Sequence, residues 1–366
     1  MLVSRDGSEI KSMFELGLSH LKNGEVEHAL NSFMKVLLHW PDCAEAYNNI
    51  GFIYFNKQNY EQAVQCFLRA LKAHPSNGRF MHNIGMCYGK MNDWESAIKF
   101  YRMSIKKDGN YAHSYYNLAG IYRDLGQYEK ALPLYEQVIV FNGELAIDAE
   151  FMVSSIKGHN IEYAPREYLT RLFDQYASYY DEHMHSQLSY NSAFVFEKLI
   201  KSIGRSYGKA LDIGCGTGAV GKYLMSASEY MIGIDLSECM IDLCRGKGYY
   251  SECILGDFID MPDLGNKGPF DCVTLCDVLV YYGEMQAMVR KSFDLLASEG
   301  DFIINFEHGN IESYQLDLNG RYRHSRDYVL GKLEENGLKI KDIIESYSRI
   351  EQGKKIDSTF VHARKL

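Results

Sequence analysis

A glycine-rich segment begins where a short apolar run ends and reads Asp212-Ile213-Gly214-Cys215-Gly216-Thr217-Gly218. Glycines in such a turn let the backbone approach a ligand, and the helix that follows presents its N-terminus to that ligand. The spacing Gly214-x-Gly216-x-x-Ala219 also fits the permissive form of a dinucleotide fingerprint. We therefore expect Gly214, Cys215, Gly216 and Gly218 to contact a nucleotide-containing cofactor.

Three carboxylates near this segment bear on the identity of the cofactor, and two of them favour S-adenosylmethionine over a dinucleotide. Asp212 lies two residues before the first glycine, where a carboxylate suits the methionine ammonium and would repel a pyrophosphate. Asp235, followed by Leu236, ends the next apolar run and can accept both ribose hydroxyls, a feature that NAD sites share. Gly256-Asp257-Phe258 follows a third run, so that Asp257 can accept the adenine amino group and Phe258 can flank the ring.

Aromatic residues upstream have the chemistry to cover a methyl donor. Tyr176, Tyr180 and His183 are spaced 4 and 3 residues apart and therefore share one helix face. Aromatic faces attract a sulfonium as they attract other cations. The alternative is that this stripe only packs on the sheet. Asp277 follows a fourth apolar run, at the edge where parallel sheets bind ligands, and is therefore expected near the cofactor. The alternative is that Asp277 caps a helix in solvent.

Candidates for the acceptor end lie further along the chain. Tyr281 and Tyr282 follow the fourth run, and Arg321, Tyr322 and His324 precede the next helix, where an acceptor-binding insertion or a plain polar loop is expected. Methyl transfer needs in-line approach of a nucleophile, which proximity and desolvation promote without a metal. A base is needed only if the acceptor holds its proton; His183, His324 and His308 are candidates, and the catalytic residue stays open.

Alternating strand and helix patterns must position these residues. Apolar β-type runs occur at 210–213, 230–235, 252–255, 271–275 and 301–306, with helical segments near 166–184, 191–203, 219–228, 237–246 and 284–298. This alternation predicts a parallel sheet covered on both faces. Residues 339–350 and 356–364 predict a terminal antiparallel hairpin around Gln352-Gly353-Lys354.

The first 145 residues repeat with a period of 34, in the windows 10–43, 44–77, 78–111 and 112–145. Small residues occupy position 8 (Gly17, Gly51, Gly85, Ala119) and position 20 (Ala29, Ala63, Ala97, Ala131), and aromatic residues occupy position 24 (Phe33, Phe67, Tyr101, Tyr135). Paired helices that approach closely at the small residues explain this pattern, which resembles the tetratricopeptide repeat (TPR). Residues 146–160 are expected to form a capping helix, and Pro133 to fall near the first turn of its helix.

Position 6 of the repeats suggests a partner-binding surface. Asn49, Asn83 and Asn117 each occupy this position on the first helix of a hairpin, which lines the concave face of such stacks. Their side-chain amides would suit the backbone of an extended peptide. The alternative is that each asparagine only bonds to a neighbouring helix.

The composition excludes several classes of protein. The chain has 366 residues, a formal net charge of −9, 46% hydrophobic and 24% charged residues, which are globular values. The acidic balance argues against nucleic acid or anionic lipid as the main partner. The absence of a membrane span or signal peptide predicts a cytoplasmic protein. Nine cysteines without a C-x-x-C pair predict reduced thiols and no metal site.

Residues 166–366 resemble class I S-adenosylmethionine-dependent methyltransferases, through the motifs above and the strand motif Phe270-Asp271-Cys272-Val273-Thr274-Leu275-Cys276-Asp277-Val278-Leu279. Three segments are similar to the TPR-containing methyltransferase family: residues 172–183 (LFDQYASYYDEH), 277–282 (DVLVYY) and 320–325 (GRYRHS). The resemblance implies α and α/β domains: an N-terminal TPR helical solenoid over 1–160, then a Rossmann-like seven-stranded class I methyltransferase domain over 161–366. It also implies S-adenosyl-L-methionine as the cofactor.

Three functions remain open from the sequence. The first is methyl transfer to a protein acceptor recruited by the solenoid. The second is a small-molecule methyltransferase whose repeats serve dimerisation or tethering, and the third is a scaffold that binds S-adenosylmethionine without turnover. Methylation of a nucleic-acid base is disfavoured, because an Asn-Pro-Pro-Tyr-type motif is replaced by Cys276-Asp277-Val278-Leu279.

Overall fold

The computed structural model describes residues 3–186, 188–351 and 353–366, so Met1, Leu2 and the expected turn residue Gln352 lie outside the described residues. The chain forms two compact units, Met1–Val153 and Ser154–Leu366. The division falls inside helix α9 (Ala146–Lys157), ahead of the boundary predicted after residue 160. Within the described part of the chain, each helix is too short or too polar to cross a membrane.

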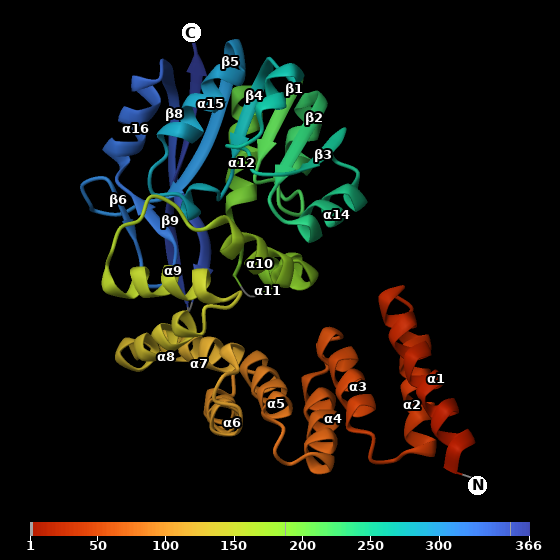
Figure 1. Cartoon of the computed structure of the whole chain (residues 1–366). Coiled ribbons are helices and arrows are strands. Elements are labelled where there is room, and N and C mark those ends of the chain that lie inside the picture. Colours follow the sequence, from red (N-terminus) through yellow and green to blue (C-terminus); the bar gives the residue numbers. More distant parts are fainter. Residues whose placement is uncertain (1–2, 187, 352) are drawn as a thin grey trace. The chain divides into compact units, whose positions relative to one another are not determined.

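The first unit is built of helical hairpins, one for each predicted repeat (Figure 1). With α9, its helices are α1 (Val3–Lys22), α2 (Val26–His39), α3 (Ala44–Asn56), α4 (Tyr60–Ala73), α5 (Gly78–Lys90), α6 (Trp94–Lys107), α7 (Ala112–Asp124) and α8 (Tyr128–Phe141). The predicted TPR architecture is confirmed.

The periodic small residues explain how each hairpin closes. A Cβ atom added to Gly51 would lie 2.6 Å from the ring of Phe67, and one added to Gly17 would lie 2.7 Å from Phe33. The glycine of position 8 thus makes room for the aromatic ring of position 24 in the same repeat. The four alanines of position 20 are completely buried. A side chain larger than these would force the paired helices apart.

Pro133 departs from its predicted place. It is the sixth residue of α8, inside the helix rather than in the first turn. Proline there removes one intrahelical hydrogen bond and crowds the preceding turn. Packing of Ala131, Tyr135 and Val138, all buried, keeps the segment helical despite that cost.

The second unit contains α/β elements. Its helices, with η for 3₁₀ turns, are α10 (Arg166–Tyr176), η1 (Ala177–Tyr179), α11 (Tyr180–Ser186), α12 (Ser192–Ile203), α13 (Gly221–Leu224), η2 (Met225–Ala227), α14 (Glu238–Lys247), η3 (Pro262–Lys267), η4 (Leu279–Tyr281), α15 (Gln286–Leu295) and α16 (Arg326–Glu335). Its strands are β1 (Tyr207–Ile213), β2 (Ser228–Asp235), β3 (Glu252–Leu255), β4 (Phe270–Leu275), β5 (Leu296–Glu307), β6 (Tyr314–Leu316), β7 (Tyr322–His324), β8 (Leu338–Glu351) and β9 (Lys354–Lys365).

Seven of these strands form one sheet in the order β3-β2-β1-β4-β5-β9-β8 (Figure 1). Strands β1 to β5 pair in parallel, and β9 runs antiparallel to both β5 and β8. This confirms the seven-stranded Rossmann-like sheet and its terminal hairpin. Two predicted helices are shorter than expected: the segment near 219–228 holds only α13 and η2, and the segment near 166–184 is broken by η1.

Helices cover both faces of the sheet, as the strand–helix alternation predicts. Leu211 and Ile213 of β1 belong to an apolar cluster that includes Met288 of α15 and Val329 of α16. Ala210, which points the other way, belongs to a second cluster with Phe196 of α12. Because the strand order reverses between β1 and β4, a crevice is expected at the carboxyl ends of these two strands.

Candidate cofactor and acceptor site

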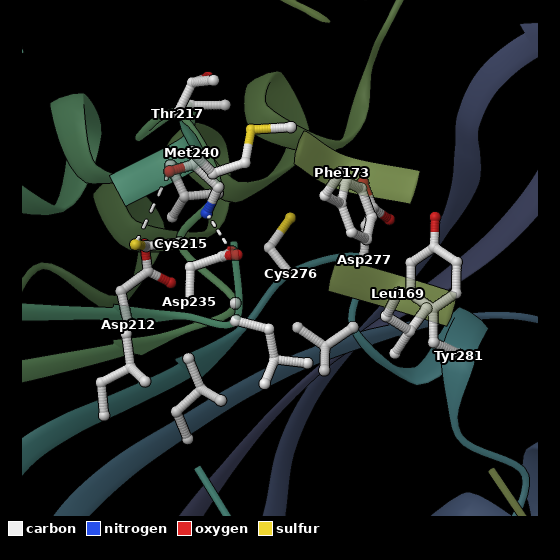
Figure 2. Close-up of a pocket in the computed structure, with 18 of the residues that line it drawn as sticks. Leu169, Phe173, Asp212, Cys215, Thr217, Asp235, Met240, Cys276, Asp277 and Tyr281 are labelled. Carbon is white, nitrogen blue, oxygen red and sulfur yellow. Dashed lines mark hydrogen bonds between the residues drawn. The ribbon is translucent and has the colours of Figure 1, made fainter. Parts of the chain in front are cut away.

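A pocket lies at the carboxyl ends of β1 and β4, where the strand order reverses (Figure 2). The predicted cofactor residues that line it are Asp212, Gly214, Cys215, Gly216, Asp235, Leu236, Gly256, Asp257, Phe258, Asp277, Tyr176 and Tyr180. Residues that are distant in the sequence therefore meet in one place. The reason is topological, since parallel strands deliver their ends to one edge of the sheet.

The glycine-rich turn is shaped by positive backbone φ angles. Gly214 has φ +67°, and a Cβ atom there would lie 2.5 Å from Cγ2 of Val278, so the turn packs directly on the segment after β4. Gly216 has φ +52° with open space where a Cβ would be. Gly218 is absent from the described residues that line the pocket; a side chain there would press on Tyr249 and Tyr250 instead.

Asp212 is buried at the end of β1, with 1% of its surface exposed. The Tyr250 hydroxyl donates to Oδ2 at 2.5 Å, and the Thr274 hydroxyl donates to Oδ1 at 2.7 Å. Burial raises the pKa of Asp212 and outweighs the two hydrogen bonds, which lower it, so that the pKa is about 6. Because a buried carboxylate favours a nearby cation, this group suits an ammonium ligand at the pocket wall.

Asp235 joins the end of β2 to the glycine-rich turn. Its Oδ2 accepts the Gly216 N–H at 2.8 Å, and its Oδ1 accepts the Ser237 N–H at 2.9 Å. Burial raises the pKa of Asp235 above its usual value, while these two N–H groups lower it. Each oxygen keeps a further lone pair that a ligand hydroxyl can use.

The segment after β3 brings Asp257 and Phe258 to the pocket, and the ring of Phe258 also packs in the core. This side chain is 4% exposed and belongs to the apolar cluster below the sheet, with the Lys291 ammonium 5.2 Å from its ring centroid. Asp257 lines the pocket and accepts the Ile259 N–H at 2.9 Å. Met240, on the first turn of α14, also lines the pocket, although the sequence did not single it out.

Asp277 has a left-handed backbone conformation with φ +56°, which is uncommon for a residue with a side chain. Its N–H donates to Asn305 Oδ1, and its Oδ1 accepts from Asn305 Nδ2 and from the Ser192 hydroxyl. Strained backbone of this kind concentrates at functional sites. Asp277 lines the pocket at the carboxyl end of β4.

Helices α10 and α11 bring tyrosines to the pocket. The rings of Tyr176 and Tyr180 lie 4.9 Å apart, and the Tyr176 hydroxyl is hydrogen-bonded to Nδ1 of His183. Burial raises the pKa of both tyrosines, so their hydroxyls are protonated at neutral pH. Tyr176 and Tyr180 of the aromatic stripe line the pocket, whereas His183 is not among the described residues that line it and is linked to it through Tyr176.

Two carboxylates that the sequence did not single out connect these helices to the cofactor turn. Asp181 of α11 accepts the Thr217 hydroxyl at 2.5 Å and the Lys247 ammonium at 2.5 Å. Asp174 of α10 accepts the Ser237 hydroxyl at 2.5 Å. Both aspartates belong to segment 172–183, which is similar to the TPR-containing methyltransferase family. This similarity is the sequence feature that could have pointed to them.

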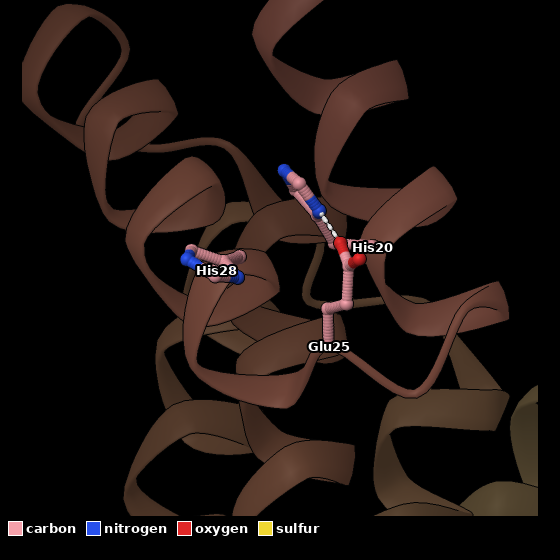
Figure 3. A group of neighbouring side chains, drawn as sticks. All are labelled: His20, Glu25 and His28. Atoms are coloured by element: carbon pink, nitrogen blue, oxygen red, sulfur yellow. Dashed lines mark hydrogen bonds and ion pairs between the residues drawn. The ribbon is translucent and has the colours of Figure 1, made fainter.

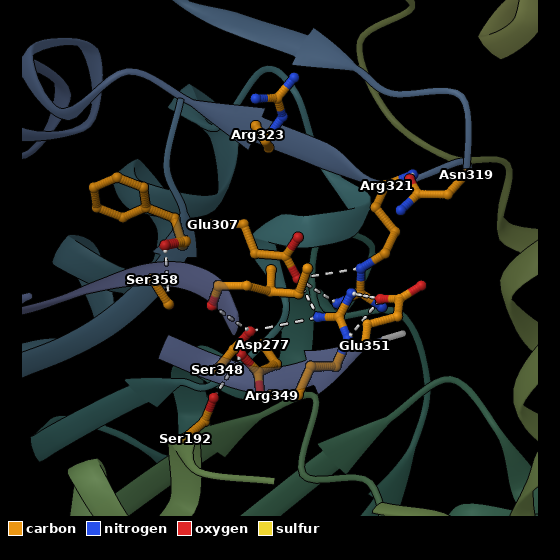
Figure 4. A network of polar contacts seen from close by, with 12 residues as sticks. Ser192, Asp277, Glu307, Asn319, Arg321, Arg323, Ser348, Arg349, Glu351 and Ser358 are labelled. Carbon is orange, nitrogen blue, oxygen red and sulfur yellow. Dashed lines mark hydrogen bonds and ion pairs between the residues drawn. The ribbon is translucent and has the colours of Figure 1, made fainter. Parts of the chain in front are cut away.

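The opposite end of the pocket contains a buried ionic network (Figure 4). Oε1 of Glu307 accepts from Arg321 Nη2 at 2.9 Å and also from Arg349 Nη1. Arg349 donates in addition to Glu351 at 2.7 Å, and Arg321 Nη1 donates to the Tyr281 hydroxyl at 3.2 Å. Burial raises the pKa of Glu307, but the two guanidiniums outweigh burial and hold it below its usual range. Glu307 and Arg349 carried no sequence signal.

The remaining acceptor candidates separate into two groups. Tyr281, Tyr282 and Arg321 line the pocket. His324 is not among the described residues that line it; β7 turns its ring into the core, where Nε2 bonds to the Gly283 carbonyl at 3.1 Å and the ring stacks on Tyr328. Burial lowers the pKa of His324 to about 4. His324 is therefore buried in the core, away from the position that its expected role in catalysis requires.

The three asparagines of the repeats make different contacts. Asn49 Nδ2 donates to the Glu45 carbonyl at 2.8 Å, within its own helix. Asn83 is 6% exposed and donates to Asn48 at 2.9 Å, across to the preceding repeat, whereas Asn117 donates to the Tyr101 hydroxyl at 3.4 Å. The contacts of Asn83 and Asn117 correspond to the alternative of bonding to a neighbouring helix, whereas the contact of Asn49 stays within its own helix. Asn49 and Asn117 are only partly buried.

Comparison with known proteins identifies both units. Residues 210–300 match the family model of the Methyltransferase domain, and residues 42–108 and 112–139 match models of the Tetratricopeptide repeat. The chain therefore carries tetratricopeptide repeats followed by a methyltransferase domain.

Individual relatives cover only part of the chain. A protein named as a methyltransferase in Geobacillus sp. (strain WCH70) is 34% identical over 35% of this chain and 54% of its own length. The methyltransferase YqeM of Bacillus subtilis (strain 168) is 33% identical over 35% of this chain and 53% of its own length. The chain thus spans about half the length of these curated relatives. Among solved structures, N-methyltransferase NodS from Bradyrhizobium japonicum WM9 with S-adenosyl-L-homocysteine is 16% identical, with a TM-score of 0.44 over 54% of this chain and 97% of that chain.

Proposed function

We propose that this chain transfers a methyl group from S-adenosylmethionine to a protein acceptor recruited by its tetratricopeptide repeats. The observation that carries the proposal is the convergence of Asp212, Asp235 and Asp257 on one pocket, at the ends of β1, β2 and β3. S-adenosylmethionine offers an ammonium, a pair of ribose hydroxyls and an adenine amino group, and each is a donor that a carboxylate accepts.

In this proposal the chain's own residues orient the donor and exclude water. Asp235 accepts the ribose hydroxyls while it holds the glycine-rich turn through Gly216. Tyr176 and Tyr180 bring aromatic faces to the positively charged sulfonium. When bound, the donor supplies an electrophilic methyl group, so alignment and desolvation of the acceptor supply most of the acceleration.

The acceptor end lies beside Asp277, Tyr281 and Arg321. Arg321 is held by Glu307 and by the Tyr281 hydroxyl, so its guanidinium is preorganised at the pocket wall. Where the acceptor must lose a proton, the Tyr176–His183 hydrogen bond offers an imidazole connected to a residue that lines the pocket. We therefore assign acceptor positioning to Arg321 and Tyr281, and proton acceptance to the Tyr176–His183 pair.

Recruitment of a protein partner rests on the first unit. Tetratricopeptide repeats generally mediate protein–protein interaction, and Asn49 and Asn117 leave part of their surface accessible. Asn83 serves the stack instead. The changes Asn49→Ala and Asn117→Ala should therefore weaken partner capture without loss of stability, whereas Asn83→Ala should lower the melting temperature.

One observation favours the second candidate, a small-molecule acceptor. Helices α10 and α11 line the pocket and are bonded to the cofactor turn and to α14 through Asp181 and Asp174, and we infer that they restrict entry to it. An acceptor carried on a protein must then present an extended segment or a flexible side chain.

The deciding experiment uses methyl-labelled donor with the purified full-length protein and host lysate. Label in macromolecules supports the protein acceptor, and label in small molecules supports the alternative. Transfer to neither class would favour a scaffold that binds without turnover. Asp235→Asn should weaken donor binding at least about tenfold, since hydrogen bonds to charged groups contribute roughly 1.5–3 kcal/mol. Asp242→Asn, which changes an exposed carboxylate of α14 paired with Arg245, is the matched control; equal donor affinity in both variants would remove the cofactor assignment.

The contribution of the repeats is tested with a fragment of the second unit. The Ser155 hydroxyl donates to the Asp317 carbonyl at 2.6 Å, and Asn160 exchanges hydrogen bonds with Tyr314 and Leu316. A fragment from Ser154 should thus bind the donor and melt higher than one from Ile161. If it methylates the acceptor as well as the full chain at limiting concentration, recruitment by the repeats is wrong.

A further inference from the structure

Two histidines and a glutamate gather at the turn of the first helical hairpin (Figure 3). His20 lies in the last turn of α1, Glu25 directly precedes α2, and His28 lies in the first turn of α2. One ligand atom from each of these side chains lies within 4.8 Å of the other two. No other group of three such side chains is found among the described residues.

The backbone of the turn brings the three side chains together. The Glu25 N–H donates to the His20 carbonyl at 2.8 Å, and Gly24 adopts φ +76°, which closes the connection between α1 and α2. His20 and Glu25 are already hydrogen-bonded through Nδ1 and Oε2, and the His20 and His28 rings lie 5.3 Å apart. The fold therefore supplies the arrangement of the ligands without distant segments.

Comparison with the other repeats shows that this arrangement is particular to the first. With the 34-residue period, His20 corresponds to Tyr54, Tyr88 and Tyr122, and His28 corresponds to Gln62, Ser96 and Lys130. The hairpin geometry needs neither histidine, because the later repeats fold with other side chains at both positions.

The residues at the repeat position of Glu25 make different contacts. Asp93, at the same repeat position, caps α6 by accepting the Ser96 N–H at 3.1 Å. In the described structure, Glu25 makes no such side-chain cap for α2, and its carboxylate is directed to His20 instead. Asn59 and Gln127, at the same position of the second and fourth repeats, also make no side-chain cap. What distinguishes Glu25 is its hydrogen bond to His20 beside His28.

We propose that His20, Glu25 and His28 bind a divalent transition-metal ion of the zinc class. Two imidazole nitrogens and one carboxylate oxygen are ligands that zinc accepts, with bonds of about 2.0–2.2 Å. The three ligand atoms now lie within 4.8 Å of one another, and metal bonds of this length require them to lie closer together. Rotation of the exposed side chains of Glu25 and His28 would bring them closer. Three protein ligands leave one coordination position for water or a partner's side chain.

A metal at this position would join α1 to α2 in the first helical hairpin. A cross-link between the two helices would stabilise the hairpin, because a metal that binds the folded arrangement of its ligands stabilises that fold. This inference is independent of the methyltransferase proposal, because it concerns residues of the first unit alone.

The test is calorimetric titration of chelator-treated full-length protein with zinc chloride. All proteins carry Cys239→Ser, which removes the exposed thiol as a competing ligand. His20→Tyr and His28→Gln introduce the residues that the second repeat has at the same positions, and His39→Gln changes an exposed histidine of α2 outside the group.

Each ligand variant should bind zinc about tenfold more weakly or worse. Loss of a residue that only supports a metal ligand already costs about 10- to 100-fold in affinity, and loss of a ligand should cost no less. The His39→Gln control should keep the parental affinity. Zinc should also raise the melting temperature of the parent and the control, but not of the ligand variants. Melting curves recorded with chelator show whether His20→Tyr and His28→Gln fold. If only one of the two variants folds, that variant alone is enough to test the proposal. Equal affinity in all proteins, or no saturable binding up to millimolar zinc, would overturn the proposal.

Discussion

Asp277 and Asn305 exchange two hydrogen bonds across the carboxyl ends of β4 and β5. The Asp277 N–H donates to Asn305 Oδ1 at 2.7 Å, and Asn305 Nδ2 donates to Asp277 Oδ1 at 2.6 Å. Asn305 is 1% exposed, so the pair is shielded from water on the side of the sheet. These bonds hold Asp277 at φ +56° beside the pocket, a conformation that costs roughly 1–2 kcal/mol for a residue with a Cβ.

The strain at Asp277 gives the first prediction. Asp277→Gly and Asp277→Ala both remove the carboxylate, but only alanine keeps the Cβ that disfavours positive φ. We expect the glycine variant to be more stable than the alanine variant by about 1 kcal/mol, measured by denaturant unfolding. Both should lose methyl transfer. Equal stability of the two variants would show that the backbone relaxes when the side chain is removed.

The pKa of Asp212 predicts how donor binding depends on pH. The pKa is about 6 in the unliganded protein, and the donor's ammonium should favour the carboxylate. Donor affinity should therefore be constant well above pH 6 and fall up to about tenfold per unit below it, with proton release on binding. Calorimetry in two buffers of different ionisation enthalpy near pH 6 measures this release. A flat profile that is shared by Asp212→Asn would contradict the placement of the ammonium.

Asp212 also makes the stability of the unliganded protein depend on pH, and this dependence has the opposite sign to that of donor affinity. Because the folded protein raises the pKa of Asp212 above its ordinary value of 3.8, the folded state binds the proton more tightly than the unfolded chain. The stability contributed by this group is present at low pH and is lost as pH rises through about 6. Asp212→Asn should flatten this part of the stability profile in the unliganded protein.

Asp181 predicts a kinetic role for α11. Asp181→Ala removes the acceptor for both the Thr217 hydroxyl and the Lys247 ammonium, and so detaches α11 from the cofactor turn. Donor dissociation should become severalfold faster, and the KM for the donor should rise more than kcat falls. Stopped-flow displacement measures the rate, with Asp242→Ala as the control on the exposed surface. Unchanged dissociation in Asp181→Ala would mean that this contact does not restrain the pocket.

Glu307 predicts a large effect on stability. Glu307→Gln leaves Arg349, which is 5% exposed, and Arg321 without their shared carboxylate. Removal of one partner from a buried pair costs about 3–5 kcal/mol, measured by denaturant unfolding. Glu345→Gln, which breaks an exposed pair with Arg326, should cost about 0–1 kcal/mol.

The pH profile separates the ionic effect from packing. The folded protein depresses the pKa of Glu307 below its usual 4.5, so its stabilisation is present above that value and is lost as pH falls further. The variant should lack this acid-dependent loss. If Glu307→Gln and Glu345→Gln were equally mild, the network would contribute no more than a surface pair.

Much of the fold follows from local patterns in the sequence. The 34-residue period, with Gly51 opposite Phe67, predicts the hairpins because both residues belong to one repeat. The glycine-rich turn and the carboxylates after each apolar run predict the cofactor end, because parallel strands place their ends together. These features depend on short-range periodicity and on one general rule of topology.

The tertiary structure alone decided which distant groups meet. Asn305, Glu307 and Arg349 lie in strands whose pattern shows only burial, and their partners are found across the sheet. His324 appeared suited to the acceptor end, but the turn of β7 directs its ring into the core. His20, Glu25 and His28 carry no recognised metal motif, and the hairpin turn brings them together. Periodicity determines which face of an element is buried, whereas pairing between side chains depends on packing that no local pattern encodes.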